Sequence, residues 1–155
     1  MKKILFAIII AVVGGLSVMC TSAQEKEIAI VAHRGFWNCD AAGSAKNSIA
    51  ALAQAQELGV WGSEFDVNLS EDGVLLVFHD GSVDGKRIEK NPASAFADHR
   101  LKNGERIPVI DEYLEQAKKH PETMLVYELK KHSCDSVETK AVDASIAKLK
   151  EYGLF

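Results

Sequence analysis

Two acidic residues at alternate positions are the first candidates for chemistry in this sequence. Glu64 and Asp66 alternate with Phe65 and Val67 within the run 59–69, and this alternation is typical of a β-strand. Successive strand side chains point to opposite faces, so the two carboxylates share one face and the apolar residues share the other. Neighbouring carboxylates repel each other unless a cation, a proton or water lies between them. The pattern therefore leaves two interpretations open, a cation site and an exposed strand with a solvated polar face.

Further polar residues lie at the ends of other predicted strands. Carboxylates from two strands suit a hard cation such as Mg²⁺ or Ca²⁺, which prefers oxygen ligands. A cation beside Arg34 and Lys130 would bind anions, and phosphate is the natural guest. Two histidines beside a phosphate can act as general base and general acid. The residues that could form such a site are His33, Arg34, Glu64, Asp66, His79, Glu128 and Lys130.

The first half of the chain predicts a βα unit followed by two extended runs. Residues 28–32 form a continuous apolar run, which is typical of a strand buried on both faces. Asn47 or Ser48 can cap a helix that ends at Gly59. The strand with the two carboxylates follows, and a turn at 71–73 leads to another extended run that ends before His79. In parallel α/β folds, ligands bind at the carboxyl ends of such strands.

The second half predicts two more helices around one strand. Residues 80–108 are expected to form a long loop with a short helix near 93–97. Asp111 is expected to cap a helix that continues to Lys119, with Tyr113, Leu114 and Ala117 on its apolar face. A strand over 124–129 then carries Glu128, and a last helix over 136–152 is expected to turn Val142, Ile146 and Leu149 inward.

The first 23 residues are predicted to be a signal peptide. Lys2 and Lys3 precede an apolar run, and residues 21–23 supply small residues for cleavage after Ala23. The alternative is a lipoprotein signal acylated at Cys20, although the large Met19 departs from the usual lipobox. Either signal predicts an exported protein, periplasmic or secreted, whose single domain begins at residue 24. The mature chain is not expected to span a membrane.

Composition limits the partners of that domain. The chain has 155 residues, of which 47% are hydrophobic and 26% charged, and its formal net charge is −4. These values are typical of one globular domain. Without Lys2 and Lys3 the chain has 16 basic and 22 acidic residues, a net charge of −6. An acidic chain without a basic cluster is not expected to bind nucleic acid, and it suits a small-molecule partner better.

The order of the motifs resembles the glycerophosphodiester phosphodiesterase family. That family has His-Arg-Gly after its first strand, then Glu-x-Asp-Val, Asp-Gly, His-Asp and later Glu-x-Lys. Each motif alone is weak, but their order and spacing together are specific and cover nearly all of the chain after the leader. The segment 107–112 is also similar to the family's Ile-Pro-Thr-Leu-Glu-Glu entry to its second helix. The counterparts here are His33-Arg34-Gly35, Glu64-Phe65-Asp66-Val67, Asp72-Gly73, His79-Asp80 and Glu128-Leu129-Lys130.

The resemblance implies a (β/α)₈ barrel, of which this chain would be the N-terminal portion, and hydrolysis of glycerophosphodiesters to glycerol 3-phosphate and an alcohol. It implies that His33 and His79 are the acid–base pair and that Arg34 and Lys130 hold the phosphate. The implied ligands of a Ca²⁺ or Mg²⁺ ion are Glu64, Asp66 and Glu128. A hydroxyl of the substrate's own glycerol would attack first and form a cyclic phosphate, which water then opens.

Two departures from the family pattern leave other interpretations open. Lys46 stands where the family's Pro-Glu-Asn-Thr motif has an acidic residue. A complete barrel takes about 250 residues, so the chain is expected to supply only part of one. An inactive remnant, or a module that binds a phosphate ligand, is the alternative to an enzyme. The phospholipase-D-like toxins, which share the barrel and the early histidine, are a more remote similarity.

Several residues without a motif are expected to be structural. Cys39 and Cys134 are expected to stay unpaired, because spacing alone does not bring them within bonding reach. Trp61 is expected in the core, and His120 and His132 are expected to be solvated.

Overall fold

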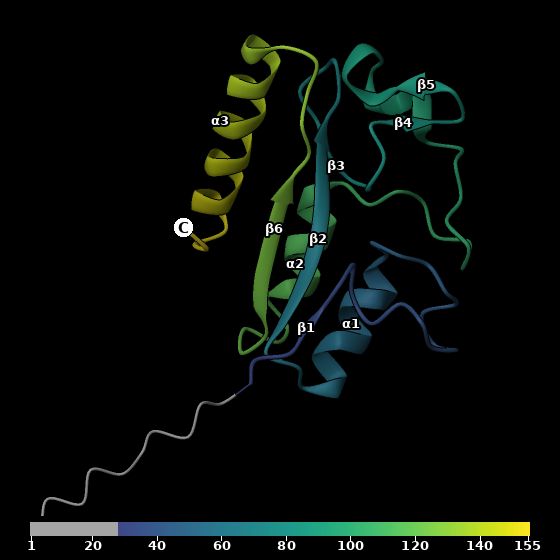
Figure 1. Cartoon of the computed structure of the whole chain (residues 1–155), viewed down its shortest axis with the longest axis vertical. Coiled ribbons are helices and arrows are strands. Elements are labelled where there is room, and N and C mark those ends of the chain that lie inside the picture. The colour runs from purple at the N-terminus through teal and green to yellow at the C-terminus, as the bar shows by residue number, and fades with distance from the viewer. Residues whose placement is uncertain (1–27) are drawn as a thin grey trace, which may run out of the picture.

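The computed structural model of this chain describes residues 28–155, which form a sheet with helices packed against it (Figure 1). The predicted signal peptide over 1–23, with its alternative at Cys20, lies outside these residues. The main sheet consists of β1 (Val31–Ala32), β2 (Gly62–Leu69), β3 (Leu75–Val77) and β6 (Met124–Leu129). The helices are α1 (Ile49–Leu58), α2 (Ile110–Ala117) and α3 (Asp135–Glu151). Between β3 and α2 lie a small hairpin, β4 (Ser82–Val83) with β5 (Lys86–Arg87), and two 3₁₀ helices, Ile88–Lys90 and Ala93–Phe96.

Strand β2 is the centre of the sheet. Strand β6 runs parallel to it along one edge, from Gly62 to Val67. The other edge is shared by β1, which is parallel to β2 at residues 62–63, and by β3, which is antiparallel to it at residues 67–69. The carboxyl ends of β1, β2 and β6 therefore meet at the same end of the sheet, as the βα pattern predicts.

The antiparallel direction of β3 was not predicted, and it determines where His79 lies. The turn after β2 is closed by hydrogen bonds between Ser70 and Val74, and Gly73 adopts a positive φ of 84° that favours glycine. The chain then runs back alongside β2, so that the Phe78 N–H donates to the Asp66 carbonyl at 2.9 Å. The hairpin thus returns His79 to the level of the carboxylates.

The core lies on the apolar face of β2. Phe65 and Val67 are fully buried, and all three helices pack side chains against them. The ring of Phe65 stacks on Tyr113 of α2 with centroids 4.5 Å apart. Leu52 of α1 and Ala141 of α3 complete this contact with 0% exposure.

The ends of the helices agree with the sequence in part. Ser48 caps α1 by accepting from the Ala51 N–H, and Gly59 ends it in a left-handed conformation, as predicted. Helix α2 begins two residues earlier than expected, with Val109 rather than Asp111 at the cap position. The reason is that the Asp111 carboxylate binds Lys148 of α3 at 2.6 Å, so it joins two helices instead of capping one.

Three expectations about burial are wrong. The apolar run 28–32 is exposed, with Ile28 at 86% and Ile30 at 61%, because only β2 pairs with β1 among the described residues. Trp61 is 51% exposed at the start of β2. For helix α3 the expectation is wrong at Val142, which is exposed, whereas Leu149 packs against the core as expected beside the buried Ala141 and Ser145.

Two further expectations concern a disulfide bond and a membrane-spanning helix. Cys39 and Cys134 are free cysteines, as expected. None of the helices in residues 28–155 has both the length and the apolar character that crossing a membrane requires.

Candidate active site

The polar face of β2 is buried rather than solvated. Glu64 is 8% exposed and Asp66 is 1% exposed, so the interpretation as a strand with a wet polar face is wrong. Burial of an ionised carboxylate costs free energy unless partners compensate for the lost water. The contacts of these two side chains therefore show what the site is built to hold.

Parallel pairing with β6 adds a third carboxylate. Asp66 lies directly opposite Glu128 in the register of the two strands, and paired residues present their side chains on the same face. Carboxylate oxygens of Glu64, Asp66 and Glu128 all lie within 4.8 Å of one another. The structure thus brings together the three residues that the sequence predicted as ligands, in a cluster that could hold a divalent cation.

Asp66 is held by three other side chains. The Lys130 Nζ donates to Asp66 Oδ1 at 3.2 Å and to Glu128 Oε1 at 2.6 Å. The Arg34 Nε lies 3.4 Å from Asp66 Oδ2, and the Asn47 Nδ2 donates to the same oxygen at 2.9 Å. The bonds to Glu128 and Asp66 raise the pKa of Lys130, so its ammonium charge is retained. Both carboxylate oxygens of Asp66 therefore have partners, Lys130 at Oδ1 and Asn47 with Arg34 at Oδ2.

The buried Glu64 carboxylate has fewer stabilising partners than Asp66. Its Oε2 accepts the Arg34 backbone N–H at 2.8 Å and lies 3.8 Å from the His33 Nε2. Its Oε1 is buried and has no hydrogen-bond partner in residues 28–155. Burial raises the pKa of Glu64, and the bond from Arg34 offsets this only in part. An orphaned carboxylate oxygen in a cluster of three carboxylates fits a hard cation with oxygen ligands.

A strained turn positions Arg34 and Asn47 around these carboxylates. Arg34 has a φ of 63° and Asn47 a φ of 58°, both in the left-handed region that most residues avoid. The Asn47 N–H donates to the Arg34 carbonyl at 3.1 Å and joins the two positions. Gly35 also has a positive φ, and a Cβ there would lie 2.7 Å from the backbone of Ala51 in α1. Each left-handed non-glycine residue costs about 1–3 kcal/mol, and such strain is concentrated at functional sites.

The two predicted acid–base histidines are both accessible. The His33 side chain is 70% exposed beside Glu64, and the His79 side chain is 38% exposed after β3. The His79 Nδ1 lies 2.7 Å from Asp80 Oδ1, a contact that orients the ring and leaves its Nε2 as the nitrogen available to a substrate.

The contacts of two residues near the site were not predicted from the sequence. Asn47 was expected only as a possible helix cap, yet its amide exchanges two hydrogen bonds with Asp66. Its place in the segment similar to Pro-Glu-Asn-Thr was the available signal. His132 is buried rather than solvated, and its Nε2 accepts the Leu69 N–H at the end of β2 at 3.0 Å.

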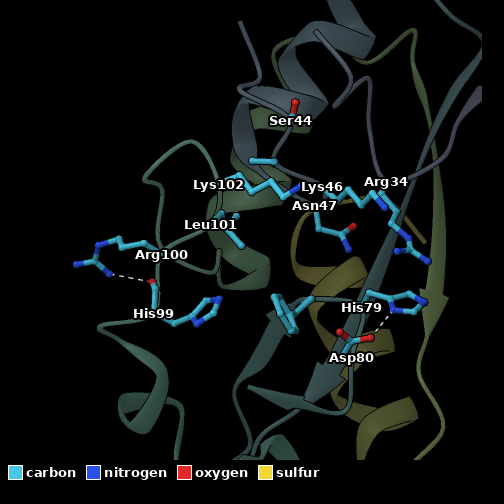
Figure 2. Close-up of a pocket in the computed structure, with 12 residues that line it drawn as sticks. Arg34, Ser44, Lys46, Asn47, His79, Asp80, His99, Arg100, Leu101 and Lys102 are labelled. Carbon is cyan, nitrogen blue, oxygen red and sulfur yellow. Dashed lines mark hydrogen bonds and ion pairs between the residues drawn. The ribbon is translucent and has the colours of Figure 1, made fainter. Parts of the chain in front are cut away.

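A cavity of about 540 Å³ opens beside the carboxylates (Figure 2). Arg34 and Asn47, which both contact Asp66, line it together with His79. The segment 99–102, which follows the second 3₁₀ helix, forms another wall. A small molecule in this cavity would therefore lie next to the acidic cluster.

Comparison with known proteins agrees with this arrangement. Residues 33–153 match the model of the glycerophosphoryl diester phosphodiesterase family. A glycerophosphodiester phosphodiesterase of Caldanaerobacter subterraneus is 36% identical over 98 residues, which are 56% of this chain and 39% of that protein. Glycerophosphodiester phosphodiesterase 1 of Mus musculus is 31% identical over 123 residues, which are 68% of this chain and 35% of that protein.

Solved structures give the same result for the fold. A glycerophosphodiester phosphodiesterase from Parabacteroides distasonis has a TM-score of 0.78 and 40% identity, covering 81% of this chain and 52% of that one. A phosphodiesterase from Oleispira antarctica has a TM-score of 0.66 and 28% identity, with coverage of 81% and 53%. The chain thus spans about half the length of these structures, and its α/β fold is part of a (β/α)₈ barrel. The match over residues 33–153 includes the whole cluster of Glu64, Asp66 and Glu128, and the chain belongs to the glycerophosphoryl diester phosphodiesterase family.

Proposed function

We propose that this site hydrolyses glycerophosphodiesters to sn-glycerol 3-phosphate and an alcohol, with one divalent cation, Ca²⁺ or Mg²⁺, held by Glu64, Asp66 and Glu128. The observation that carries the proposal is the buried, unpartnered Glu64 Oε1 within a cluster of three carboxylates. The cation would supply charge that stabilises a bound phosphate and its transition state.

The charges of the site support a phosphate monoanion as the guest. Three carboxylates face two cationic side chains, Arg34 and Lys130, so the protein groups alone have a net charge of −1. A divalent cation changes this to +1, and a phosphodiester with its single negative charge then restores neutrality. The Lys130 Nζ, which spans Asp66 and Glu128, is placed to turn from these oxygens to the phosphate.

The chain's own residues would perform the proton transfers. Arg34 and Lys130 hold the phosphate, while one of the two histidines removes the proton from a glycerol hydroxyl that attacks the phosphorus. The other gives its proton to the departing alcohol, and a cyclic phosphate remains. Water then opens the ring with the roles of His33 and His79 reversed, which yields sn-glycerol 3-phosphate.

The relatives support the substrate class. The Oleispira antarctica phosphodiesterase was solved in complex with the product sn-glycerol-3-phosphate. The leader at residues 1–23 supports export, so we also propose that hydrolysis takes place in the periplasm or outside the cell.

The test is release of sn-glycerol 3-phosphate from glycerophosphoglycerol, whose alcohol is uncharged, measured with a coupled dehydrogenase. We expect release that needs Ca²⁺ or Mg²⁺, stops with a chelator and falls to background in His33→Ala and His79→Ala. Lys140→Gln, an exposed change on α3, is the matched control and should keep the rate. Release that persists in both histidine variants, or no release with either metal, would contradict the proposal.

A further inference from the structure

The cavity beside the acidic cluster is lined by more positive charge than a single phosphate requires. Arg34, Lys46 and Lys102 all line it, against one carboxylate, Asp80, which is bound to His79. Figure 2 shows Arg34, Lys46 and Lys102 along one wall, with His79 and Asp80 opposite them. We call this cavity, lined by Arg34, Lys46, His79, Asp80 and Lys102, the basic pocket.

The two lysines are the uncommitted charges of the basic pocket. Neither Lys46 nor Lys102 forms an ion pair with a carboxylate within residues 28–155, whereas Arg34 is engaged with Asp66. The Lys46 ammonium lies 4.6 Å from the centre of the Trp37 ring, a cation–π contact that limits its movement. Both lysines are solvent-exposed, so a ligand can reach them without breaking an ion pair.

Arg100 lines the same cavity but does not add to this charge. Its guanidinium donates to the carbonyls of Ala97 at 2.7 Å and His99 at 3.0 Å. Figure 2 shows it pointing away from the cavity. The positive charge is therefore concentrated on the side where Lys46 and Lys102 lie, near Arg34.

The position of the basic pocket defines which part of a substrate enters it. Arg34 and His79 line the pocket and also belong to the proposed reaction site, so a diester bound there would extend one of its two substituents into the pocket. Glycerol is uncharged and gains little from two extra ammonium groups. The substituent that would gain is an alcohol with its own negative charge.

We propose that the basic pocket selects glycerophosphodiesters whose alcohol carries an additional phosphate or carboxylate, with Lys46 and Lys102 as specificity-determining residues. This inference rests on the proposed function, because the pocket is assigned by its position beside the proposed phosphate site. A cationic alcohol such as choline would be disfavoured by the same charges.

The experiment measures binding, so it does not depend on turnover. His33→Ala protein in the presence of Ca²⁺ is titrated with three diesters: glycerophosphoglycerol, the same diester with a terminal phosphate on its alcohol, and glycerophosphocholine. The readout is the ratio of the dissociation constant of glycerophosphoglycerol to that of the phosphorylated diester, because a ratio cancels effects common to both. We expect the phosphorylated diester to bind most tightly and glycerophosphocholine most weakly.

Variants of the two lysines identify the source of this preference. Lys46→Gln and Lys102→Gln should each reduce the ratio about three- to tenfold, and the double variant should remove the preference. Lys140→Gln removes one exposed charge outside the pocket and should leave the ratio unchanged. A ratio near one in the His33→Ala background, or a ratio that survives in the double variant, would overturn the inference. If hydrolysis fails while the lysine-dependent ratio is found, the proposed function fails and the pocket assignment stands.

Discussion

At the scale of single residues, the two carboxylates of β2 differ in how they are compensated. Asp66 is bound by Lys130, Arg34 and Asn47, whereas Glu64 has one oxygen without a partner in the described residues. Because a buried carboxylate destabilises the fold unless it is paired, the same chemical change should have opposite effects at the two positions.

The first prediction compares amide variants of these residues in metal-free protein. Glu64→Gln removes a poorly compensated charge and should raise the free energy of unfolding by about 1 kcal/mol. Asp66→Asn removes the partner of Lys130 and Arg34 and should lower it by about 1–3 kcal/mol. Urea unfolding in the presence of a chelator, followed by tryptophan fluorescence, measures both. Equal losses in the two variants would show that the carboxylates are equally compensated.

The pKa of Glu64 adds a pH dependence to this comparison. Burial raises that pKa above its ordinary 4.5, so the protonated group contributes stability that is complete below 4.5 and lost as pH rises through the raised value. In Glu64→Gln the amide does not ionise, so this position makes no pH-dependent contribution to stability. The stability advantage of the variant should therefore grow as pH rises through that range, and an advantage independent of pH would contradict the assignment.

A second prediction concerns Gly35, in the turn that holds Arg34, and uses Gly73 in the β2–β3 turn as its reference. Gly73→Ala, at a positive φ with no atom within 4 Å of the new Cβ, should lower the free energy of unfolding by about 1–2 kcal/mol from backbone strain alone. Gly35→Ala also meets the Ala51 backbone at 2.7 Å and should cost about 1–3 kcal/mol more. Chemical unfolding of both variants tests this difference. A cost at Gly35 no larger than at Gly73 would mean that the turn relaxes away from α1.

At the scale of elements, periodicity predicted the type of each main element but not its relations to the others. Apolar alternation located β2, and the Ser48 and Gly59 signals gave both ends of α1. All seven candidate site residues could be named from the sequence, because each follows or lies in a predicted strand. The direction of β3 and the exposure of Val142 on α3 depend on pairing and packing with distant segments, which local periodicity does not contain.

His132 illustrates why such contacts escape sequence reasoning. No motif surrounds it, and its partner Leu69 lies 63 residues away. Its Nε2 accepts the Leu69 N–H, and its Nδ1 lies 3.3 Å from Glu138, so the ring joins the end of β2 to α3. The side chain thus anchors the carboxyl end of the strand that carries Glu64 and Asp66.

The third prediction follows from this contact. His132→Ala leaves a buried backbone N–H without an acceptor and should lower the free energy of unfolding by about 1–3 kcal/mol. His132→Gln, whose amide oxygen can take the place of the Nε2, should recover part of the loss. His120→Ala, at a partly exposed position, should change stability by less than about 0.5 kcal/mol. Equal effects of His132→Ala and His120→Ala would contradict the structural role.

At the scale of the whole molecule, an apolar surface lies at the opposite end of the sheet from the carboxylates. Ile28 and Ile30 precede and adjoin β1, and Leu58 and Trp61 flank the turn between α1 and β2. All four are more than half exposed, at 86%, 61%, 58% and 51%. An exposed apolar surface beside a strand edge favours association with another chain.

The fourth prediction is therefore concentration-dependent self-association of the purified chain. Ile30→Lys/Trp61→Lys should shift the chain to monomer in sedimentation velocity, because both lysines place charge on the apolar surface. Val142→Lys, which charges an exposed position on α3, should have no such effect. Association that persists in the double variant would show that another surface is responsible.

The most direct test of the account is whether Glu64, Asp66 and Glu128 bind a divalent cation. Isothermal titration of the metal-free chain with Ca²⁺ and Mg²⁺ should show one site per chain for at least one of the two ions. Glu64→Gln and Asp66→Asn should each weaken it about tenfold or more, although they change stability in opposite directions. Glu71→Gln, an exposed acid outside the cluster, should leave it unchanged. Undiminished binding in both cluster variants, or no binding of either ion to the wild-type chain, would contradict the central claim.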